Sequence, residues 1–285
     1  MLRVSKVLNN NVVIASHASG WETVLVGRGI GFGRKVGDPV EESWAEKVFV
    51  LKDPKERLRY AKVLAEIDGS FAALVAQGIA IMEDHLGVPL GERIHASLTD
   101  HLFFAVKRLR EGIAVRNPFA REVAAMYPKE HAASQAMLRW LSEEVHLDMP
   151  DDEAAFVALH VHSAMGGEDL GRVAWKNRVI SELVAITEES LGFRLDRLSP
   201  HYMRFIRHLS FSIDRVEGGI EGDLEGDPIS TLEETMKREN PVPYGIALKL
   251  CLYMRNALDR PIPPAEVVYL TIHIHRLYNS KQRDK

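Results

Sequence analysis

The stretch HLFFAVKRL, residues 101–109, occurs a second time 107 residues later as HLSFSIDRV, residues 208–216. The histidine, the leucine, one phenylalanine and the arginine keep their places in both copies, and the apolar residues recur with helical spacing. Solenoid repeats have periods of roughly 20–50 residues. A spacing of 107 residues exceeds that range, so the repeat indicates a duplicated domain.

Two further blocks repeat in the same order. IMEDHLG at residues 81–87 returns as ITEESLG at 186–192, and PDDEAAFVALHVH at 150–162 returns 113 residues later as PPAEVVYLTIHIH at 263–275. We place the boundary between the repeats near residues 166–169. Helical spacing of apolar residues also predicts individual helices, at Lys55–Ala65, Phe71–Leu86, Leu98–Glu111 and Trp175–Leu191.

The first 50 residues carry a different pattern. Short apolar or β-branched runs separated by turn-forming residues predict strands at Val4–Leu8, Val12–Ser16, Thr23–Val26 and Lys47–Leu51. GRGIGFGR at residues 27–34 alternates glycine with larger residues, so we expect a further extended stretch with one nearly bare face.

The predicted fold is therefore multidomain. A small four-stranded antiparallel β domain precedes two homologous all-α helical-bundle domains. We place these domains at residues 1–60, 61–171 and 172–285.

Charge is distributed unevenly along the chain. The net charge is −4, yet residues 1–35 carry five basic residues against the single acid Glu22. A small basic head on an acidic body is typical of a nucleic-acid-binding module joined to a regulatory body. Cys251 is the single cysteine, which excludes an intrachain disulfide framework and favours a reducing cytoplasm. We expect no secretory leader, and no membrane insertion, because the longest apolar stretch, Phe71–Met82, is shorter than the ~20 residues that span a bilayer.

Four histidines occupy matched positions in the two repeats: His101, His160, His208 and His273. Three interpretations are open. The histidines could be buried and hydrogen-bonded, they could bind a metal, or they could accept a phosphoryl group. The third fits imidazole chemistry, because a pKa of about 6.5 leaves a nucleophilic lone pair at neutral pH. A phosphoryl group would add negative charge and could recruit arginine partners.

Metal and catalytic chemistry are less favoured. In the pairs His160-x-His162 and His273-x-His275, residues two apart on a helix are rotated by roughly 200°, so both rings cannot reach one ion. The glycine run is followed by no Gly-Lys-Ser/Thr, and the chain has no Gly-x-Ser-x-Gly. We therefore expect no catalytic residues, no metal and no cofactor.

The head is a candidate RNA-binding surface. Sheet surfaces with an exposed aromatic residue and arginines stack unpaired bases, whereas readers of duplex DNA usually insert a helix. Phe32 is the candidate for stacking, with Arg28 and Lys6 on phosphates or base edges; the alternative for Phe32 is a place in the core of the sheet. The remaining candidates are small or amide residues: Asn9, Asn10, Asn11, Gly27 and Gly29. The asparagines could instead serve only as turn residues, and the glycines would let the backbone approach a ligand closely.

Two head segments, KVLNNNV at 6–12 and GRGIGF at 27–32, resemble the RNA-binding head of the BglG/SacY-type transcriptional antiterminators. The duplicated body resembles the paired regulatory domains of that family, which the sugar phosphotransferase system controls. Segments 14–17, 116–119 and 160–164 look most like its glucose-type, GlcT-like subgroup.

The resemblance implies a mechanism. The head, as a homodimer, would bind a hairpin in a leader mRNA and so prevent formation of an overlapping terminator, with Lys6, Asn11, Gly27, Arg28 and Phe32 as direct contacts. A sugar permease enzyme II of the glucose type and the phosphocarrier protein HPr would phosphorylate the four matched histidines. His275 departs from the family, where an acidic or other polar residue is common. Two alternatives stay open: a DNA-binding activator controlled by the same system, and a metal-dependent hydrolase that uses the His-x-His pairs.

Overall fold

The computed structural model describes residues 2–17, 20–218 and 227–283 of the chain. They form two units. The first unit comprises Met1–Ala120 and Tyr127–Leu170, and the second comprises Arg121–Met126 and Gly171–Lys285. Most of the first repeat therefore packs together with the head, while a short segment from the middle of that repeat packs in the second unit.

The head is an antiparallel sheet of five strands in the order β4-β1-β2-β3-β5. The strands are β1 (Leu2–Asn9), β2 (Val12–Ser16), β3 (Glu22–Val26), β4 (Pro39–Val40) and β5 (Lys47–Leu51). The four predicted strands are present, and β4 is an addition. Two residues are too few to carry an alternating pattern, and Pro39 sits at the sheet edge, where a missing backbone donor is tolerated.

The prediction that residues 27–34 form an extended stretch is wrong. The segment is a series of tight turns, in which the Ile30 amide donates to the Gly27 carbonyl over 3.1 Å and the Phe32 amide donates to the Gly29 carbonyl over 3.0 Å. Gly29 and Gly33 have φ angles of 73° and 68°, a region that glycine enters without strain. The regular spacing of the glycines therefore encodes repeated turns and not a strand.

The first unit contains five helices of thirteen residues or more among its described residues: α1 (Pro54–Glu66), α2 (Gly69–Leu86), α3 (Arg93–Arg110), α5 (Pro128–Val145) and α6 (Asp151–Gly166). Local sequence explains their ends. The Asp53 carboxylate accepts from the Lys55 amide and Pro54 opens α1, while Gly87 ends α2 with a φ of 71°. The three helices predicted in this region are confirmed.

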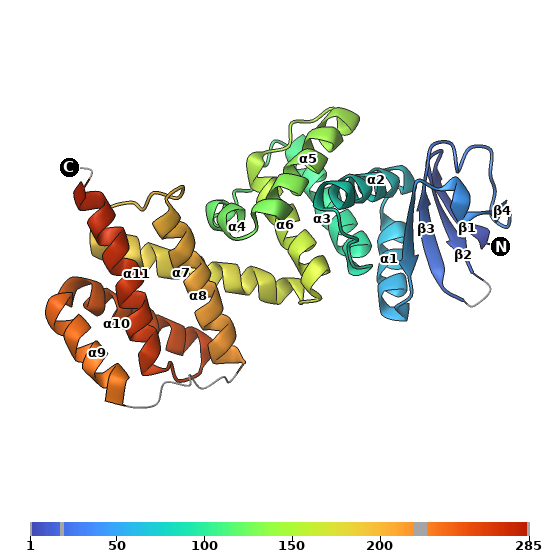
Figure 1. Cartoon of the computed structure of the whole chain (residues 1–285). Coiled ribbons are helices and arrows are strands. Elements are labelled where there is room, and N and C mark those ends of the chain that lie inside the picture. Colours follow the sequence, from blue (N-terminus) through green and yellow to red (C-terminus); the bar gives the residue numbers. More distant parts are fainter. Residues whose placement is uncertain (1, 18–19, 219–226, 284–285) are drawn as a thin grey trace. The chain divides into compact units, whose positions relative to one another are not determined.

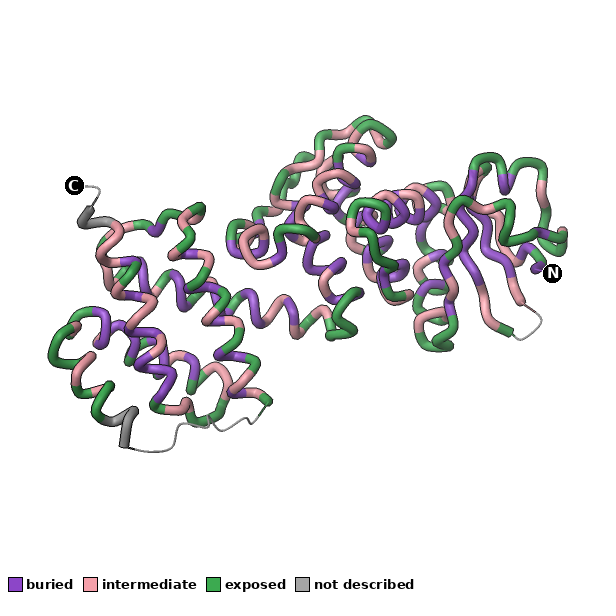
Figure 2. Tube along the Cα trace, viewed as in Figure 1, coloured by how far each residue is buried: buried purple, intermediate pink, exposed green. Residues whose placement is uncertain are grey.

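One face of the sheet shares a hydrophobic core with the helices beside it (Figure 1). Leu8, Val24 and Phe49 belong to the same buried cluster as Val75 and Ile79 of α2. Buried residues accordingly run through both the strands and α2 (Figure 2). The other face has a smaller buried cluster. Strand residues form most of it, and Ile30 of the 27–34 segment and Val40 of β4 complete it: Leu2, Val4, Val13, Ala15, Leu25, Ile30 and Val40. The head and the first helical domain are therefore packed as one body.

The second unit holds the helices of the second repeat together with the short helix α4 (Ala120–Met126) of the first. Its other described helices are α7 (Leu170–Leu191), α8 (Pro200–Glu217), α9 (Asp227–Glu239), α10 (Pro241–Leu258) and α11 (Pro264–Arg283), with single end residues of α4 and α7 in the first unit. The predicted helix at Trp175–Leu191 is confirmed within α7. Tyr202, Phe205 and Leu250 lie in its fully buried core. In the described part of the chain, no helix combines the length and apolarity that a bilayer crossing requires.

Candidate functional site

In the head, two segments far apart in sequence build one surface. The Asn11 amide donates to Asn9 Oδ1 over 2.8 Å, which makes a compact turn between β1 and β2. The Asn11 Oδ1 atom in turn accepts a 2.9 Å hydrogen bond from the Gly29 amide, and the Gly31 amide donates to the Asn10 carbonyl over 2.9 Å. The asparagine turn thus holds the glycine loop in place.

Close packing of backbone on backbone explains two of the glycines. A Cβ atom on Gly31 would lie 2.1 Å from the Asn9 carbonyl oxygen, and one on Gly27 would lie 3.0 Å from the Trp44 carbonyl oxygen. The position of Gly31 therefore requires glycine for the fold of the head, whereas a side chain at Gly27 would need the neighbouring backbone to give by a few tenths of an ångström. The close approach that we expected Gly27 to offer a ligand is made here by the protein's own backbone.

The loop carries exposed side chains suited to nucleic acid. Phe32 is 74% exposed, so the alternative that places it in the core of the sheet is wrong. Arg28 is exposed as well, and among the described residues its guanidinium has no hydrogen-bond or ion-pair partner. Asn10 is exposed beside them in the turn. An aromatic face and a free guanidinium can stack a base and bind a phosphate.

Lys6 lies on a different part of the head. It is paired with Ile14 across β1 and β2, and directly opposed residues share one face of an antiparallel pair. Ile14 belongs to the core that joins sheet and helices, and the Lys6 ammonium donates to the Leu64 carbonyl of α1 over 2.9 Å. In this conformation the Lys6 charge is directed to α1.

The first pair of matched histidines meets in the first unit. The ring centres of His101, on α3, and His160, on α6, are 5.0 Å apart. The His101 Nε2 atom lies 3.0 Å from Oε2 of Glu153, whose side chain is almost fully buried. Arg108 lies further along α3, and its Nη2 atom is 3.7 Å from Oε1, the other oxygen of the same carboxylate.

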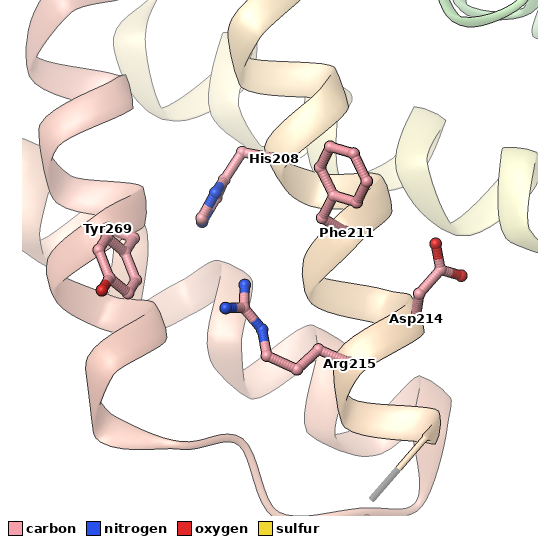
Figure 3. Close-up of a pocket in the computed structure, with 5 residues that line it drawn as sticks. All are labelled: His208, Phe211, Asp214, Arg215 and Tyr269. Carbon is pink, nitrogen blue, oxygen red and sulfur yellow. The ribbon is translucent and has the colours of Figure 1, made fainter. Parts of the chain in front are cut away.

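The second pair repeats this arrangement in the second unit. The His208 and His273 ring centres are 4.7 Å apart, His208 Nε2 is 3.4 Å from Glu266 Oε2, and Arg215 Nη2 is 2.9 Å from Glu266 Oε1. Figure 3 shows the His208 ring and the Arg215 guanidinium turned toward the same hollow. This open hollow has a volume of about 580 Å³, and its lining residues are His208, Phe211, Asp214, Arg215 and Tyr269.

Comparisons with known proteins agree with both parts of the chain. Residues 2–57 match the model of the CAT RNA binding domain, and residues 77–164 and 181–277 each match the model of the PRD domain. The PtsGHI operon antiterminator of Bacillus subtilis (strain 168) is 37% identical over 279 residues, with 97% of each chain covered. The transcription antiterminator LicT of the same strain is 30% identical over 276 residues, with 97% of this chain and 99% of LicT covered.

The chain belongs to the antiterminator family in which a CAT domain precedes two PRD domains. The resemblance stated from the sequence is therefore confirmed. A crystal structure of GlcT CAT-PRDI matches with a TM-score of 0.52 and 40% sequence identity, and covers 57% of this chain and 97% of that chain. The relatives are named for antitermination and not for a catalysed reaction.

The PRD histidines are neutral where they are buried. Burial, assisted by the neighbouring His101, lowers the pKa of His160 to about 3, and burial with the neighbouring His208 lowers that of His273 to about 4. Burial alone would raise the pKa of Glu266, but hydrogen bonds from His208 and Ser212 and the charge of Arg215 outweigh it, so the pKa is lowered. The second PRD thus combines an uncharged imidazole with an ionised carboxylate at neutral pH.

The His-x-His pairs of the PRDs do not converge. His162 Nδ1 lies 3.0 Å from Glu130 Oε1, and its ring stacks on Tyr127 at 3.9 Å. His275 Nε2 lies 2.8 Å from Asn279 Nδ2. Within residues 2–17, 20–218 and 227–283, no group of three or more histidine, cysteine, aspartate or glutamate side chains could hold a metal ion.

The sequence interpretation missed the charged partners of the histidines. Four charged residues stand in the repeated blocks, yet the sequence interpretation gave a functional role to the histidines alone: Glu153, Glu266, Arg108 and Arg215. Their signal was the retention of a glutamate and an arginine at matched positions of the two repeats. A buried charge is costly unless it is paired, so its retention in both copies indicates a shared site.

Proposed function

We propose that this protein is a transcriptional antiterminator. As a homodimer in the cytoplasm, it binds a partly paired hairpin in a nascent leader mRNA and so prevents an overlapping terminator from forming. It turns over no substrate and uses no cofactor or metal. Family membership along nearly the whole chain supports this assignment.

The observation that carries the proposal is the loop at residues 27–34, which presents Phe32 and Arg28 to solvent on hydrogen-bonded turns. We assign RNA contacts to the eight head residues chosen from the sequence: Lys6, Asn9, Asn10, Asn11, Gly27, Arg28, Gly29 and Phe32. Asn9 and Asn11 use their Oδ1 atoms within the head, so their Nδ2 groups are the atoms we assign to RNA.

We further propose that phosphorylation of His101, His160, His208 and His273 controls RNA binding. The donors are a glucose-type permease enzyme II for the first PRD and HPr for the second. Neutral imidazoles in two matched sites support a role as phosphoryl acceptors. The glucose assignment rests on the 37% identity to a PtsGHI operon antiterminator. We also propose that the head ends at residue 60 and the first PRD at residue 171.

A salt-titrated gel shift of the full chain tests RNA recognition. The probe is the leader hairpin of a glucose permease operon, with a scrambled hairpin and duplex DNA as competitors. The full chain is used because the head shares its core with the first PRD. Tight, hairpin-selective binding supports the antiterminator. Selective binding of duplex DNA would instead favour the DNA-binding activator.

A reporter assay tests regulation. His101→Ala or His160→Ala should allow read-through of the terminator without glucose, because the inhibitory phosphoryl group has no acceptor. Unchanged repression in both variants would remove the first PRD from the switch.

A further inference from the structure

A glutamate and an arginine lie beside His101 and beside His208, the first matched histidine of each PRD, but other neighbours differ. His101, Glu153, Arg108 and Phe156 correspond to His208, Glu266, Arg215 and Tyr269. On the helix turn after the histidine, the first PRD has Ala105 and the second has Ser212. The Ser212 hydroxyl donates to Glu266 Oε2 over 2.5 Å and lies 3.4 Å from His208 Nε2.

We infer that Glu153 and Glu266 position His101 and His208 for phosphoryl acceptance, that Arg108 and Arg215 bind the arriving phosphoryl group, and that Ser212 makes the second site the less reactive one. This inference rests on the proposed function, in which these histidines are phosphorylated. Beyond that function, it names the residues that make these histidines reactive and a difference in reactivity between the two PRDs.

The carboxylate determines which ring nitrogen reacts. An ionised carboxylate only accepts hydrogen bonds, so the His101 proton sits on Nε2 and the lone pair is on Nδ1. When Nδ1 bonds to phosphorus, the bond from phosphorus to the donor atom breaks, and its electron pair leaves with that atom. The acceptor ring keeps its Nε2 proton and becomes cationic. Glu153 stabilises this positive charge, as a carboxylate does for the imidazolium of a Ser-His-Asp triad.

The arginine is placed for the incoming negative charge. Arg215 lines the open hollow together with His208 (Figure 3). The guanidinium has five donors, and the carboxylate contact leaves some of them for phosphoryl oxygens. Arg108 holds the matching place beside Glu153.

Ser212 weakens the second site. Its hydroxyl proton takes up part of the Glu266 charge, and Nε2 of His208 is 3.4 Å from the carboxylate instead of the 3.0 Å of the first PRD. The carboxylate is thus shared between two donors, whereas Ala105 offers no second donor to Glu153. We expect the developing positive charge on His208 to be less well stabilised.

Phosphoramidate, a small N-phosphorylated donor that leaves as ammonia, tests the acceptor sites without a protein partner. The full chain is incubated with it, and phosphorylation at each histidine is followed by peptide mass spectrometry at neutral pH. Exposed His85 and His146 serve as internal references. Glu153→Gln should slow phosphorylation of His101 by at least about tenfold and should change the shape of the pH–rate profile measured at that histidine. Arg108→Gln should slow phosphorylation of His101, and Arg108→Lys should retain most of the wild-type phosphorylation rate.

Exchange of the differing residue tests the asymmetry. Ser212→Ala should speed phosphorylation of His208 by about threefold, and Ala105→Ser should slow phosphorylation of His101 by a similar factor. This is the size of effect expected of one hydrogen bond. Glu130→Gln is the matched control, because it removes a carboxylate from His162 in the same unit and should leave His101 unchanged. Equal rates at His101 in wild type, Glu153→Gln and Glu130→Gln would overturn the inference alone. Failure of both phosphoramidate and the protein donors to label wild-type His101 and His208 would overturn the proposed function as well.

Discussion

The ammonium group of Lys6 in β1 donates a 2.9 Å hydrogen bond to the carbonyl oxygen of Leu64 in α1. Lys6 is also one of the proposed RNA contacts, so helix and RNA would compete for the same charge. A head residue assigned to RNA therefore has a second partner in the helix that leads to the first PRD.

This competition predicts the behaviour of Lys6→Ala. RNA affinity should fall, and the slope of log affinity against log salt should decrease by about one, because one phosphate contact is lost. Gel shifts at several salt concentrations measure both. Lys129→Ala, an exposed lysine on α5, is the control and should leave the slope unchanged. An unaltered slope in Lys6→Ala would mean that its ammonium stays on Leu64 in the complex.

Phe32→Ala should weaken hairpin binding by about 1–3 kcal/mol, the contribution of one aromatic stacking contact. Because the side chain is 74% exposed, thermal unfolding should change little. Val36→Ala is the matched control, since Val36 is 71% exposed in the neighbouring loop but offers no aromatic face. Equal affinities for Phe32→Ala and Val36→Ala would show that the stacking surface lies elsewhere.

Gly31→Ala should destabilise the head by about 1–3 kcal/mol, because the new methyl group would meet the Asn9 carbonyl oxygen at 2.1 Å. The asparagine turn and the glycine loop would separate, so hairpin binding should fall with stability. Gly166→Ala is the control, as its nearest neighbour atom would be 4.0 Å away. Thermal unfolding and a gel shift of both variants provide the measurement. A stable, fully binding Gly31→Ala would contradict the assigned contact.

His95 predicts a dependence of stability on pH. Its ring is 1% exposed, packs 4.7 Å from Phe49 and 5.7 Å from Tyr60, and burial lowers its pKa from 6.5 to about 4. Between these values the unfolded chain binds a proton that the folded chain does not, so stability falls as pH decreases below 6.5. The slope approaches about 1.4 kcal/mol per pH unit for one such group.

His95→Phe keeps an aromatic ring in this place and removes the titration. Urea unfolding at pH 7.5, 6.0 and 5.0 should therefore show a smaller loss of stability on acidification than in wild type. Phe49→Leu is the control, because it alters the same packing and leaves His95 to titrate. Parallel pH profiles for wild type and His95→Phe would assign the acid sensitivity to other groups.

Local sequence was sufficient for much of the architecture. The helices at Phe71–Leu86 and Trp175–Leu191 followed from apolar spacing, and the structure bears them out. The family followed from short motifs in the head and the order of the repeats. The glycine loop was misread because alternation every second residue is shared by strands and by successive turns, and only the positive φ angles of Gly29 and Gly33 separate the two.

The sequence by itself determined that the chain has a strand-rich head and two copies of one helical domain, because periodicity and repetition are properties of residues close in sequence or at constant spacing. Only the tertiary structure decided that Glu153 meets His101 across 52 residues, that Lys6 reaches Leu64 across 58, and that Phe32 faces solvent. Such contacts depend on how helices and sheet pack together. A local sequence pattern does not show whether a carboxylate or an aromatic side chain is buried or exposed. The packing of the folded chain decides this.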